Sequence, residues 1–333
     1  MSSLPRAVFL SSSQQNRMAK VYSPATRAAI RRYVDLSDTV YTPDDAPGDG
    51  VSYIFSTWGM PVLTEDEIAA RFPDLRAVFY GAGSVQHFAR PFLARGVAVH
   101  SAWAANGVPV AETTVAEIIL ANKGFYQTSR VFREQGKPAA TALLANYPGS
   151  FDVSVGLLGC GMIGSMVAQR LRDYRVAVQV FDPFVSDERL AALGASRASL
   201  DEIFSECSVI SNHLANNAQT RGMLTYAHFS RMLPYATFIN TGRGAQLIEA
   251  DLVQALQEVP TRTAVLDVTF PEPPEAGHPF YTLPNVILTP HLAGSHNHEV
   301  ARMGEYMAEE CERVLTGGAP KWQVTEKMLE TMA

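Results

Sequence analysis

The sequence contains little cysteine. Only Cys160, Cys207 and Cys311 occur in 333 residues, and none belongs to a CxxC pair or to a Cys/His spacing typical of zinc sites. Widely separated single cysteines do not build a disulfide framework, so we expect a reducing compartment and no bound metal.

Long apolar runs are also missing. No stretch approaches the roughly 18–20 apolar residues that a membrane span requires. The apolar segment AVFL near the N-terminus is followed at once by SSSQQNR and is too short for the core of a signal peptide. AVFL therefore predicts a first strand, and we expect a cytoplasmic protein with no membrane partner.

Positive charge is not in excess. The chain has 33 acidic and 27 basic residues, a formal net charge of −6, which predicts no general attraction to nucleic acid. Apolar residues make up 47% and charged residues 18%, as in ordinary globular proteins. A length of 333 residues favours two domains.

In the first hundred residues, short apolar runs alternate with helical stretches. TEDE supplies acidic residues for the first turn of a helix expected over Thr64–Arg71. Strands alternating with helices imply a parallel sheet with helices on both faces. The expected strands are Ala7–Leu10, Val51–Phe55, Ala77–Tyr80 and Val97–His100.

A second series of strands begins at Val153, after an expected long helix over Thr113–Phe125 and a connection over Glu134–Ser150. Six strand candidates in order suit a doubly wound sheet. A final helix, from about His298 to Leu315, could fold back onto the first domain. The six candidates are VSVGLLG, VAVQVFD, SVISNH, ATFINTG, TAVLDV and NVILTPH.

A glycine-rich turn, GLLGCGMIG, follows the first strand of this series and precedes a helix. Gly159, Gly161 and Gly164 suit a tight turn, a close backbone approach to a pyrophosphate and close packing of helix on strand. The amides of Met162 and Ile163 at the helix N-terminus would hold the phosphates. An ordinary glycine-rich turn is the alternative interpretation.

Asp182 ends the next strand, 23 residues after Gly159. A carboxylate there would bind the hydroxyls of the adenosine ribose and repel a 2′-phosphate, which favours NAD over NADP. The alternative is a turn-forming aspartate before Pro183. Some use of NADP stays open because three arginines are close in sequence, namely Arg172, Arg175 and Arg189.

Three later strand ends carry a guanidinium, carboxylates and an imidazole. TFINTGRG contains Arg243, AVLDVTFPEPP contains Asp267 and Glu272, and NVILTPHLAG contains His291. Arg243 can pair with a substrate carboxylate or polarise the adjacent carbonyl. His291 would exchange a proton with the carbonyl oxygen, while Glu272 would orient the imidazole and favour its protonated form. Each of them alone could be a surface charge or a packing group.

NTGRG, LDVxxxE and TPH, in that order after GxGxxG, resemble the D-isomer-specific 2-hydroxyacid dehydrogenase family over roughly residues 75–300. The family's catalytic arginine, glutamate and histidine fall on Arg243, Glu272 and His291. The resemblance implies an NAD-dependent D-2-hydroxyacid dehydrogenase, a small 2-keto or 2-hydroxy acid as substrate, and a homodimer.

The resemblance also implies an α/β fold of two Rossmann-like or flavodoxin-like domains with parallel sheets. The NAD domain, residues 113–299, would be inserted into a substrate domain formed by residues 1–112 and 300–333. The backbone amides of Ala82 and Gly83, in YGAGSVQHF, would bind the substrate carboxylate, and Arg243 and His291 would also contact the substrate. The further cofactor-binding positions that it implies are His213, Thr241, Gly242, Arg243, Asp267, His291 and Gly294.

Three segments depart from the family pattern. In SVQH, Gln86 stands where the family has an aspartate. In PVAETTVAE, Ala111 stands at the place of an asparagine, with Asn106 earlier in a lengthened loop, SAWAANGVP. In HLANNAQT, Asn216 and Asn217 replace a Pro-Leu pair, so we expect altered contacts to the nicotinamide ribose.

Two tryptophans lie near these segments. Trp58 and Trp103 could line the substrate pocket, although core packing is the favoured interpretation. No cluster of arginine or lysine stands in the first-domain loops, which disfavours a phosphorylated substrate. Glyoxylate, hydroxypyruvate and bulkier apolar 2-keto acids stay open.

Two other functions occur on the same fold. Corepressors of the C-terminal-binding type bind NAD and act as protein scaffolds, and formate dehydrogenases pair their histidine with a glutamine. The complete catalytic set argues against the first, and Glu272 argues against the second.

Overall fold

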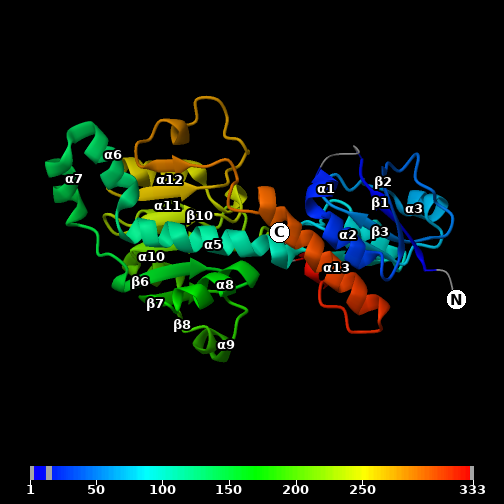
Figure 1. Cartoon of the computed structure of the whole chain (residues 1–333). Helices are drawn as coiled ribbons and strands as arrows, with labels where there is room; N and C mark the ends of the chain where they lie inside the picture. The colour runs from blue at the N-terminus through cyan, green and yellow to red at the C-terminus, as the bar shows by residue number, and fades with distance from the viewer. Residues whose placement is uncertain (1–3, 13–16, 331–333) are drawn as a thin grey trace. The chain divides into compact units, whose positions relative to one another are not determined.

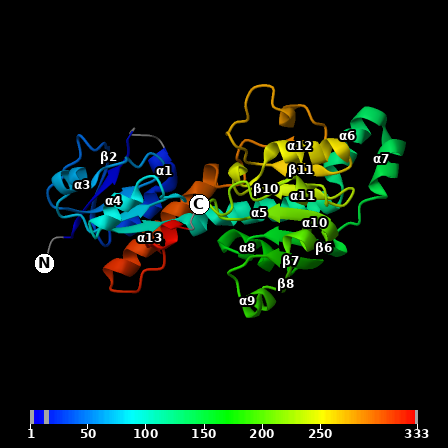
Figure 2. The ribbon, with the colours of Figure 1, turned by 180° about the vertical axis from the view of Figure 1, so that it is seen from behind.

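The computed structural model of the chain describes residues 4–12 and 17–330. They form two compact units, one built from the chain up to Gly107 and from Ser295 onward, the other from Val108–Gly294. Each unit is a mainly parallel sheet with helices packed on it (Figure 1), and Figure 2 shows the same elements from behind. The α/β fold with two parallel-dominated sheets predicted from the sequence is confirmed.

Within the described residues, the first unit has a six-stranded sheet in the order β13-β5-β4-β3-β1-β2. Only β13 runs antiparallel to its neighbour β5. The four expected strands are present, whereas β2 and β13 were not predicted, because β2 is a mostly exposed edge strand and β13 is very short. The strands are β1 (Arg6–Leu10), β2 (Asp35–Tyr41), β3 (Val51–Ser56), β4 (Ala77–Tyr80), β5 (Ala98–Ser101) and β13 (Gln323–Val324).

The predicted helix in this unit, α3 (Glu65–Arg71), begins with a capping box in which Thr64 and Glu67 bond each other's backbone amides. The C-terminal helix α13 (Ala301–Leu315) lies beside α1 and α2 (Figure 1) and buries Met303 and Met307 in the core of this unit. The expected return of this helix to the first domain is confirmed. The remaining helical segments are α1 (Arg17–Val21), α2 (Pro24–Ile30), α4 (Ala89–Ala94), η3 (Asn297–Val300) and η4 (Met328–Glu330).

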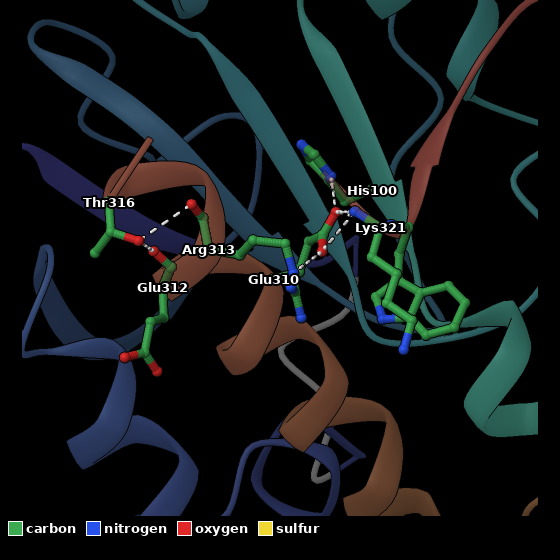
Figure 3. A network of polar contacts seen from close by, with 7 residues as sticks. His100, Glu310, Glu312, Arg313, Thr316 and Lys321 are labelled. Atoms are coloured by element: carbon green, nitrogen blue, oxygen red, sulfur yellow. Dashed lines mark hydrogen bonds and ion pairs between the residues drawn. The ribbon is translucent and has the colours of Figure 1, made fainter. Parts of the chain in front are cut away.

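A buried carboxylate fastens α13 to the sheet. Glu310 is fully buried, and its Oε1 lies 2.9 Å from Nδ1 of His100 on β5 (Figure 3). The same carboxylate accepts hydrogen bonds of 2.8–3.1 Å from the backbone amides of Lys321 and Trp322. Burial lowers the pKa of His100, and the charge of Glu310 opposes this shift. These contacts fix the two residues that precede β13, the strand that pairs with β5 at His100.

Within the described residues, the second unit has a seven-stranded parallel sheet in the order β12-β11-β10-β9-β6-β7-β8. The order reverses at β6, which lies between β7 and β9, and such a switch point opens a crevice at the carboxyl ends of the strands. The six predicted strands are present; β8 was missed because only one of its three residues, Ala195, is apolar and none of them is fully buried. The strands are β6 (Phe151–Leu158), β7 (Arg175–Phe181), β8 (Ala195–Arg197), β9 (Val209–Asn212), β10 (Thr237–Asn240), β11 (Thr263–Leu266) and β12 (Val286–Leu288).

Alternate residues of this sheet belong to two different cores. On β10, Phe238 packs with residues of α10 (Leu200–Glu206) and α12 (Glu249–Glu258). Its neighbour Ile239 packs with residues of α5 (Trp103–Asn122) and α8 (Met162–Leu171). Helices therefore cover both faces of the sheet, as a parallel sheet requires. The helical segments of this unit are α6 (Phe125–Gln135), α7 (Lys137–Leu144), α8 (Met162–Leu171), α9 (Asp187–Ala192), α10 (Leu200–Glu206), η1 (Gly244–Gln246), α11 (Tyr226–Phe229), α12 (Glu249–Glu258) and η2 (Pro279–Tyr281).

Two predictions about helices were wrong. Helix α5 (Trp103–Asn122) begins well before Thr113 and includes Pro109, so most of SAWAANGVP is helix and not a lengthened loop. Proline removes one helical hydrogen bond, and burial of Ala105 and Ala111 on the same helix offsets this loss.

The supposed connection over Glu134–Ser150 is also largely helical. Helix α6 continues to Gln135, and α7 follows directly, forming a helical hairpin (Figure 1). Gly136, with φ of 81°, reverses the chain between the helices, and Pro138 stands in the first turn of α7, where it costs no hydrogen bond. The glycine and proline therefore mark a helix boundary and not a long loop.

None of the helices in the described ranges is long and apolar enough to cross a membrane. Residues 4–12 and 17–330 contain no group of three His, Cys, Asp or Glu side chains placed to hold a metal. All three cysteines are described, buried and free of disulfides.

Candidate cofactor and active site

The glycine-rich turn packs the start of α8 tightly against the end of β6. Gly159 has φ of 95°, and a Cβ there would lie 2.7 Å from the carbonyl oxygen of His213. A Cβ on Gly164 would overlap the carbonyl oxygen of Gly159. Both positions therefore require glycine for the turn to form.

Gly161 differs from its two neighbours in the motif, because a Cβ there would meet no atom within 4 Å. The space beside it is open, and α8 begins at Met162 without a side-chain cap. The first amides of a helix bind anions when no cap occupies them. The turn thus has the open space and the uncapped helix N-terminus that the pyrophosphate of a dinucleotide would need.

Asp182, at the end of β7, is bound to its own surroundings. Its Oδ2 accepts the amide of Cys160 in the glycine turn at 2.7 Å, and its Oδ1 accepts the amides of Phe184 and Val185 at 2.8 and 3.2 Å. The turn-forming role considered for this residue is therefore present. It also holds the glycine turn against the end of β7.

A guanidinium that the sequence did not single out lies beside Asp182. Arg197 donates to the carbonyl oxygens of Asp182 and Val185 at 2.7 and 2.5 Å and pairs with Asp187. By contrast, Arg175 pairs with Asp152, away from this position. A cavity of about 380 Å³ adjoins the segment and is lined by Phe181, Asp182, Pro183, Arg197, Ala198, Ser199 and Glu202.

Arg243 follows β10 in a turn fixed by polar side chains. Asn240 donates to the carbonyl oxygen of Arg243 at 3.0 Å and accepts the amide of Gly242 at 3.1 Å. The guanidinium donates to the Gly242 carbonyl at 2.7 Å. Burial lowers the pKa of Arg243, and the charge of Glu272 opposes the shift. Thr241 in the same turn lies 3.1 Å, oxygen to oxygen, from Thr114 on α5.

The Arg243 turn also contacts the segment that carries Glu272. A Cβ on Gly244 would overlap the backbone of Thr269. The backbone approach is so close that only glycine fits. Position 244 therefore fixes the distance between the chain at Arg243 and the loop that leads to Glu272.

Asp267, at the end of β11, organises the turn that contains His291. This buried carboxylate accepts hydrogen bonds from the Thr289 hydroxyl at 2.6 Å and from the amides of Leu292 and Ala293 at 2.7 and 2.9 Å. The amide of His291 donates to the Asp267 carbonyl oxygen at 3.1 Å. His291 itself has φ of 57°, a left-handed conformation that these contacts stabilise. Gly294 ends this turn.

His291 and Glu272 form a close pair. Nδ1 of the imidazole lies 2.6 Å from Oε1 of the carboxylate, and the two side chains are 46% and 41% exposed. An acceptor at Nδ1 fixes the orientation of the ring and directs Nε2 to the opposite side. The structure therefore brings Arg243, Glu272 and His291 together at the carboxyl edge of the sheet.

One buried carboxylic acid near this edge was missed in the sequence. Glu117 on α5 is 8% exposed, and its Oε2 has no hydrogen-bond partner among the described residues. Burial, reinforced by the charge of Asp267, raises the pKa of Glu117 to about 8. The sequence signal that could have revealed Glu117 is its position as an acidic residue between the apolar Val115 and Ile118.

The segment after β9 begins with a partly buried histidine. Burial lowers the pKa of His213 to about 4, and its Nε2 lies 3.0 Å from the Ser211 hydroxyl. Asn217, which stands at a departure from the family pattern, accepts the amides of Gln219 and Thr220 at 3.0 and 3.1 Å. Its side chain therefore shapes the loop itself.

In the first unit, Ala82 and Gly83 form the turn after β4. The hydroxyl of Ser101 donates to both carbonyl oxygens, at 3.0 and 2.6 Å. Asn106 lies beside Gly83 and accepts the amide of Ser295 at 3.1 Å. Gln86, which stands at the place of the family's aspartate, donates to the Leu329 carbonyl at 2.7 Å. The turn is thereby fixed within this unit.

The two tryptophans pack against the core of the first unit. Trp103 meets Trp322 edge to face with ring centroids 5.6 Å apart. The guanidinium of Arg17 lies 5.8 Å from the ring centre of Trp58. These contacts favour core packing for both residues.

Known proteins resemble this chain in sequence and in fold. Residues 115–293 match the family model described as "D-isomer specific 2-hydroxyacid dehydrogenase, NAD binding domain". The chain is 32% identical over 254 residues to the D-3-phosphoglycerate dehydrogenase of Mycobacterium tuberculosis strain H37Rv, covering 75% of this chain and 47% of that protein. It is 29% identical over 223 residues to the D-3-phosphoglycerate dehydrogenase of Archaeoglobus fulgidus, covering 67% and 42%. The chain thus spans about half the length of these curated relatives.

Solved structures share the fold over almost the whole chain. A phosphoglycerate oxidoreductase from Rhizobium etli superposes with a TM-score of 0.79 at 22% identity, covering 98% of this chain and 99% of that one. The apo form of D-mandelate dehydrogenase from Rhodotorula graminis gives a TM-score of 0.76 at 18% identity, covering 96% and 98%. This chain therefore belongs to the D-isomer specific 2-hydroxyacid dehydrogenase family, with its NAD-binding domain in residues 115–293.

Proposed function

We propose that this protein is an NAD-dependent D-2-hydroxyacid dehydrogenase that reduces a small 2-keto acid. The observation that carries the proposal is the 2.6 Å contact between His291 Nδ1 and Glu272 Oε1, in a turn adjoining Arg243. A basic group, a proton donor and an orienting carboxylate are what reduction of a carbonyl beside a carboxylate requires.

In this proposal each side chain has one task. Arg243 binds the substrate carboxylate and, with the amides of Ala82 and Gly83, orients the carbonyl carbon. His291 gives a proton from Nε2 to the carbonyl oxygen, and Glu272 stabilises the charged imidazolium before the transfer. Bound NADH supplies the hydride to the carbonyl carbon.

The cofactor site rests on the glycine turn and the strand ends of the second unit. Gly159, Gly161 and Gly164 with the amides of Met162 and Ile163 hold the pyrophosphate, and Asp182 binds the adenosine ribose. NAD is preferred to NADP because Asp182 adds a negative charge where the 2′-phosphate of NADP would lie. On the nicotinamide side we assign His213, Thr241, Gly242, Asp267 and Gly294.

The substrate is a 2-keto acid with a small or apolar side chain. Relatives named as phosphoglycerate dehydrogenases make a phosphorylated substrate the natural competitor. Ser101, whose hydroxyl bonds the carbonyl oxygens of Ala82 and Gly83, and Asn106, which lies beside Gly83, both carry no charge. Neither side chain would bind a phosphate as a cation does.

We also propose a homodimer that pairs through the second unit. Helix α6 leaves Phe125 and Phe132 49% and 54% exposed, and Phe151 at the start of β6 is 60% exposed. Large exposed apolar side chains mark interaction surfaces. Light scattering of the purified protein would return a monomer mass if this assignment is wrong.

The activity is tested by following NADH consumption with glyoxylate, hydroxypyruvate, pyruvate, phenylpyruvate, 2-ketoisocaproate and 3-phosphohydroxypyruvate. We expect turnover with one of the unphosphorylated acids, and a fall in kcat/KM of about 10²- to 10⁴-fold for His291→Ala, since proton transfer contributes this much. The affinity for NADH should be kept. His298→Ala, which changes an exposed histidine, is the matched control.

Two results would count against the proposal. A His291→Ala variant as active as the parent would remove the proton donor from the mechanism. Tight binding of NADH with no turnover of any acid would favour the scaffold function of the NAD-binding corepressors.

A further inference from the structure

Three amide side chains lie together beneath the carboxyl edge of the second unit's sheet. Asn212 ends β9, Asn240 ends β10, and Gln246 lies in η1, after Arg243. All three are fully buried. Their polar atoms each have a hydrogen-bond partner, in seven bonds altogether. We call these three residues the amide cluster.

Asn212 is the centre of the amide cluster. Its Nδ2 donates to Oδ1 of Asn240 at 3.0 Å and to Oε1 of Gln246 at 2.6 Å. One side chain thus joins two others that come from different segments of the chain.

The remaining five bonds reach backbone atoms on two sides. On one side, Asn240 holds the Gly242 amide and the Arg243 carbonyl, as described above. On the other, Gln246 Nε2 donates to the carbonyl oxygens of Leu214 and Ala215 at 2.5 and 3.0 Å, and Asn212 Oδ1 accepts the Leu214 amide at 3.2 Å.

The amide groups cost free energy that apolar side chains of the same volume would not. A buried amide must be fully hydrogen-bonded merely to compensate for its lost hydration. We attribute their presence to the backbone that they bind, namely the Arg243 turn and residues 214–215. Both segments adjoin the contacts proposed for substrate and cofactor. The side-chain hydrogen bonds between Asn217 and Thr220 stay within the loop after Ala215 and do not tie it to the Arg243 turn.

We propose that Asn212, Asn240 and Gln246 are positioning residues that hold the Arg243 turn and the segment 214–215 in one fixed arrangement. The proposal rests on the function proposed above, in which Arg243 binds the substrate carboxylate and the segment after His213 meets the nicotinamide side of NADH. Loss of the amide cluster then lowers the affinity for the substrate and for NADH, although no group that contacts either ligand is removed.

The experiment separates positioning from stability. Gln246→Leu and Asn212→Leu each leave a buried amide partly unpaired, so both lower the melting temperature. The double variant replaces both partners by apolar groups and recovers part of this loss, because no amide of that pair is left unpaired. Phe204→Leu, in a core of the same unit, is the control for lost stability alone.

All variants are compared well below their melting temperatures. We expect the double variant to bind NADH about tenfold or more weakly and to show a raised KM for the 2-keto acid with a smaller change in kcat, since misplacement of remote groups costs up to about 10²-fold. Phe204→Leu should keep the parent's values. Hydrogen exchange at the Gly242 and Leu214 amides should quicken in the double variant.

The proposal is overturned if the double variant binds NADH and the keto acid as the parent does, or no worse than Phe204→Leu at an equal loss of melting temperature. A parent protein without turnover would sink the proposed function instead. NADH affinity, measured by fluorescence, and amide exchange would still decide the role of the amide cluster.

Discussion

Three carboxylates near the candidate site differ in how their charge is compensated. Asp267 is buried but accepts three hydrogen bonds from the turn of His291. Glu272 is partly exposed and pairs with an imidazole. Glu117 is buried with one oxygen unpartnered among the described residues. An uncompensated buried carboxyl avoids its charge by keeping its proton.

The pH dependence of stability should report on Glu117. Its pKa is about 8 in the folded protein, against an ordinary value of 4.5. Between these two values the folded chain holds a proton that the unfolded chain has lost, so the free energy of unfolding falls as the pH rises through this window. The contribution is fully present below about pH 4.5 and is lost above about pH 8.

Glu117→Gln removes this titration. We expect the variant's free energy of unfolding to exceed the parent's by a margin that grows from pH 4.5 to pH 8, at most a few kcal/mol at about 1.4 kcal/mol per pH unit. Urea unfolding at a series of pH values measures it. Glu112→Gln, a half-exposed glutamate on the same helix, should run parallel to the parent. Parallel curves for Glu117→Gln would mean that this carboxyl is ionised at neutral pH.

Some of these residues could be found in the sequence and others could not. Arg243, Asp267 and His291 follow strands, and the carboxyl ends of parallel strands share one edge, so their meeting was predictable. The environment of Glu117 was not, because the periodicity of a helix gives the face of a residue but not the groups that surround it. The partners of Asp182 were also hidden, since they are backbone amides that depend on the path of the turn.

At the scale of the elements, the turn between β6 and α8 contains one glycine needed for folding and another that we expect to matter for cofactor binding. Gly164 is required by packing, because a Cβ there would overlap the Gly159 carbonyl oxygen. Gly161 faces open space. Gly164→Ala should therefore lower the free energy of unfolding by about 1–3 kcal/mol and weaken NADH binding as well.

Gly161→Ala is the matched variant and should keep the parent's melting temperature. Its added methyl group occupies the space proposed for the pyrophosphate, so NADH should bind at least about tenfold more weakly. This corresponds to a loss of about 1.4 kcal/mol or more of binding free energy. Calorimetry and NADH fluorescence give the two quantities. Parent-like affinity in Gly161→Ala would move the phosphates away from the N-terminus of α8.

Elements with a strong apolar pattern were predictable, and those without one were not. The central strands β9, β10 and β11 are buried throughout and each contains adjacent large apolar residues. By contrast, β2 and β8 are largely exposed strands whose pairing comes from their neighbours. Helix α5 was predicted too short because Pro109 is a local signal of a break, and tertiary burial overrode it.

At the scale of the whole molecule, each unit has its own hydrophobic core. The core of the first unit includes residues of β1, β3, β4 and α13, and the second unit has one core on each face of its sheet. The second unit spans Val108–Gly294, so the first unit is built from two separate segments of the chain. It is complete only when α13 packs on it and β13 pairs with β5. The contacts of Glu310 stabilise this arrangement, because they link α13 to β5 and to the residues just before β13.

Replacing Glu310 should therefore loosen the first unit alone. Glu310→Ala leaves His100 and two backbone amides without their acceptor, and removal of one partner from a buried pair costs about 3–5 kcal/mol. Hydrogen exchange should quicken in β5, β13 and α13, while β6, β9 and β10 keep the parent's protection and NADH binding is unchanged. Glu310→Gln retains one carbonyl acceptor and should lose less. Equal loss of protection in both units would show that their cores unfold as one, and that the carboxylate supports the second sheet as much as the first.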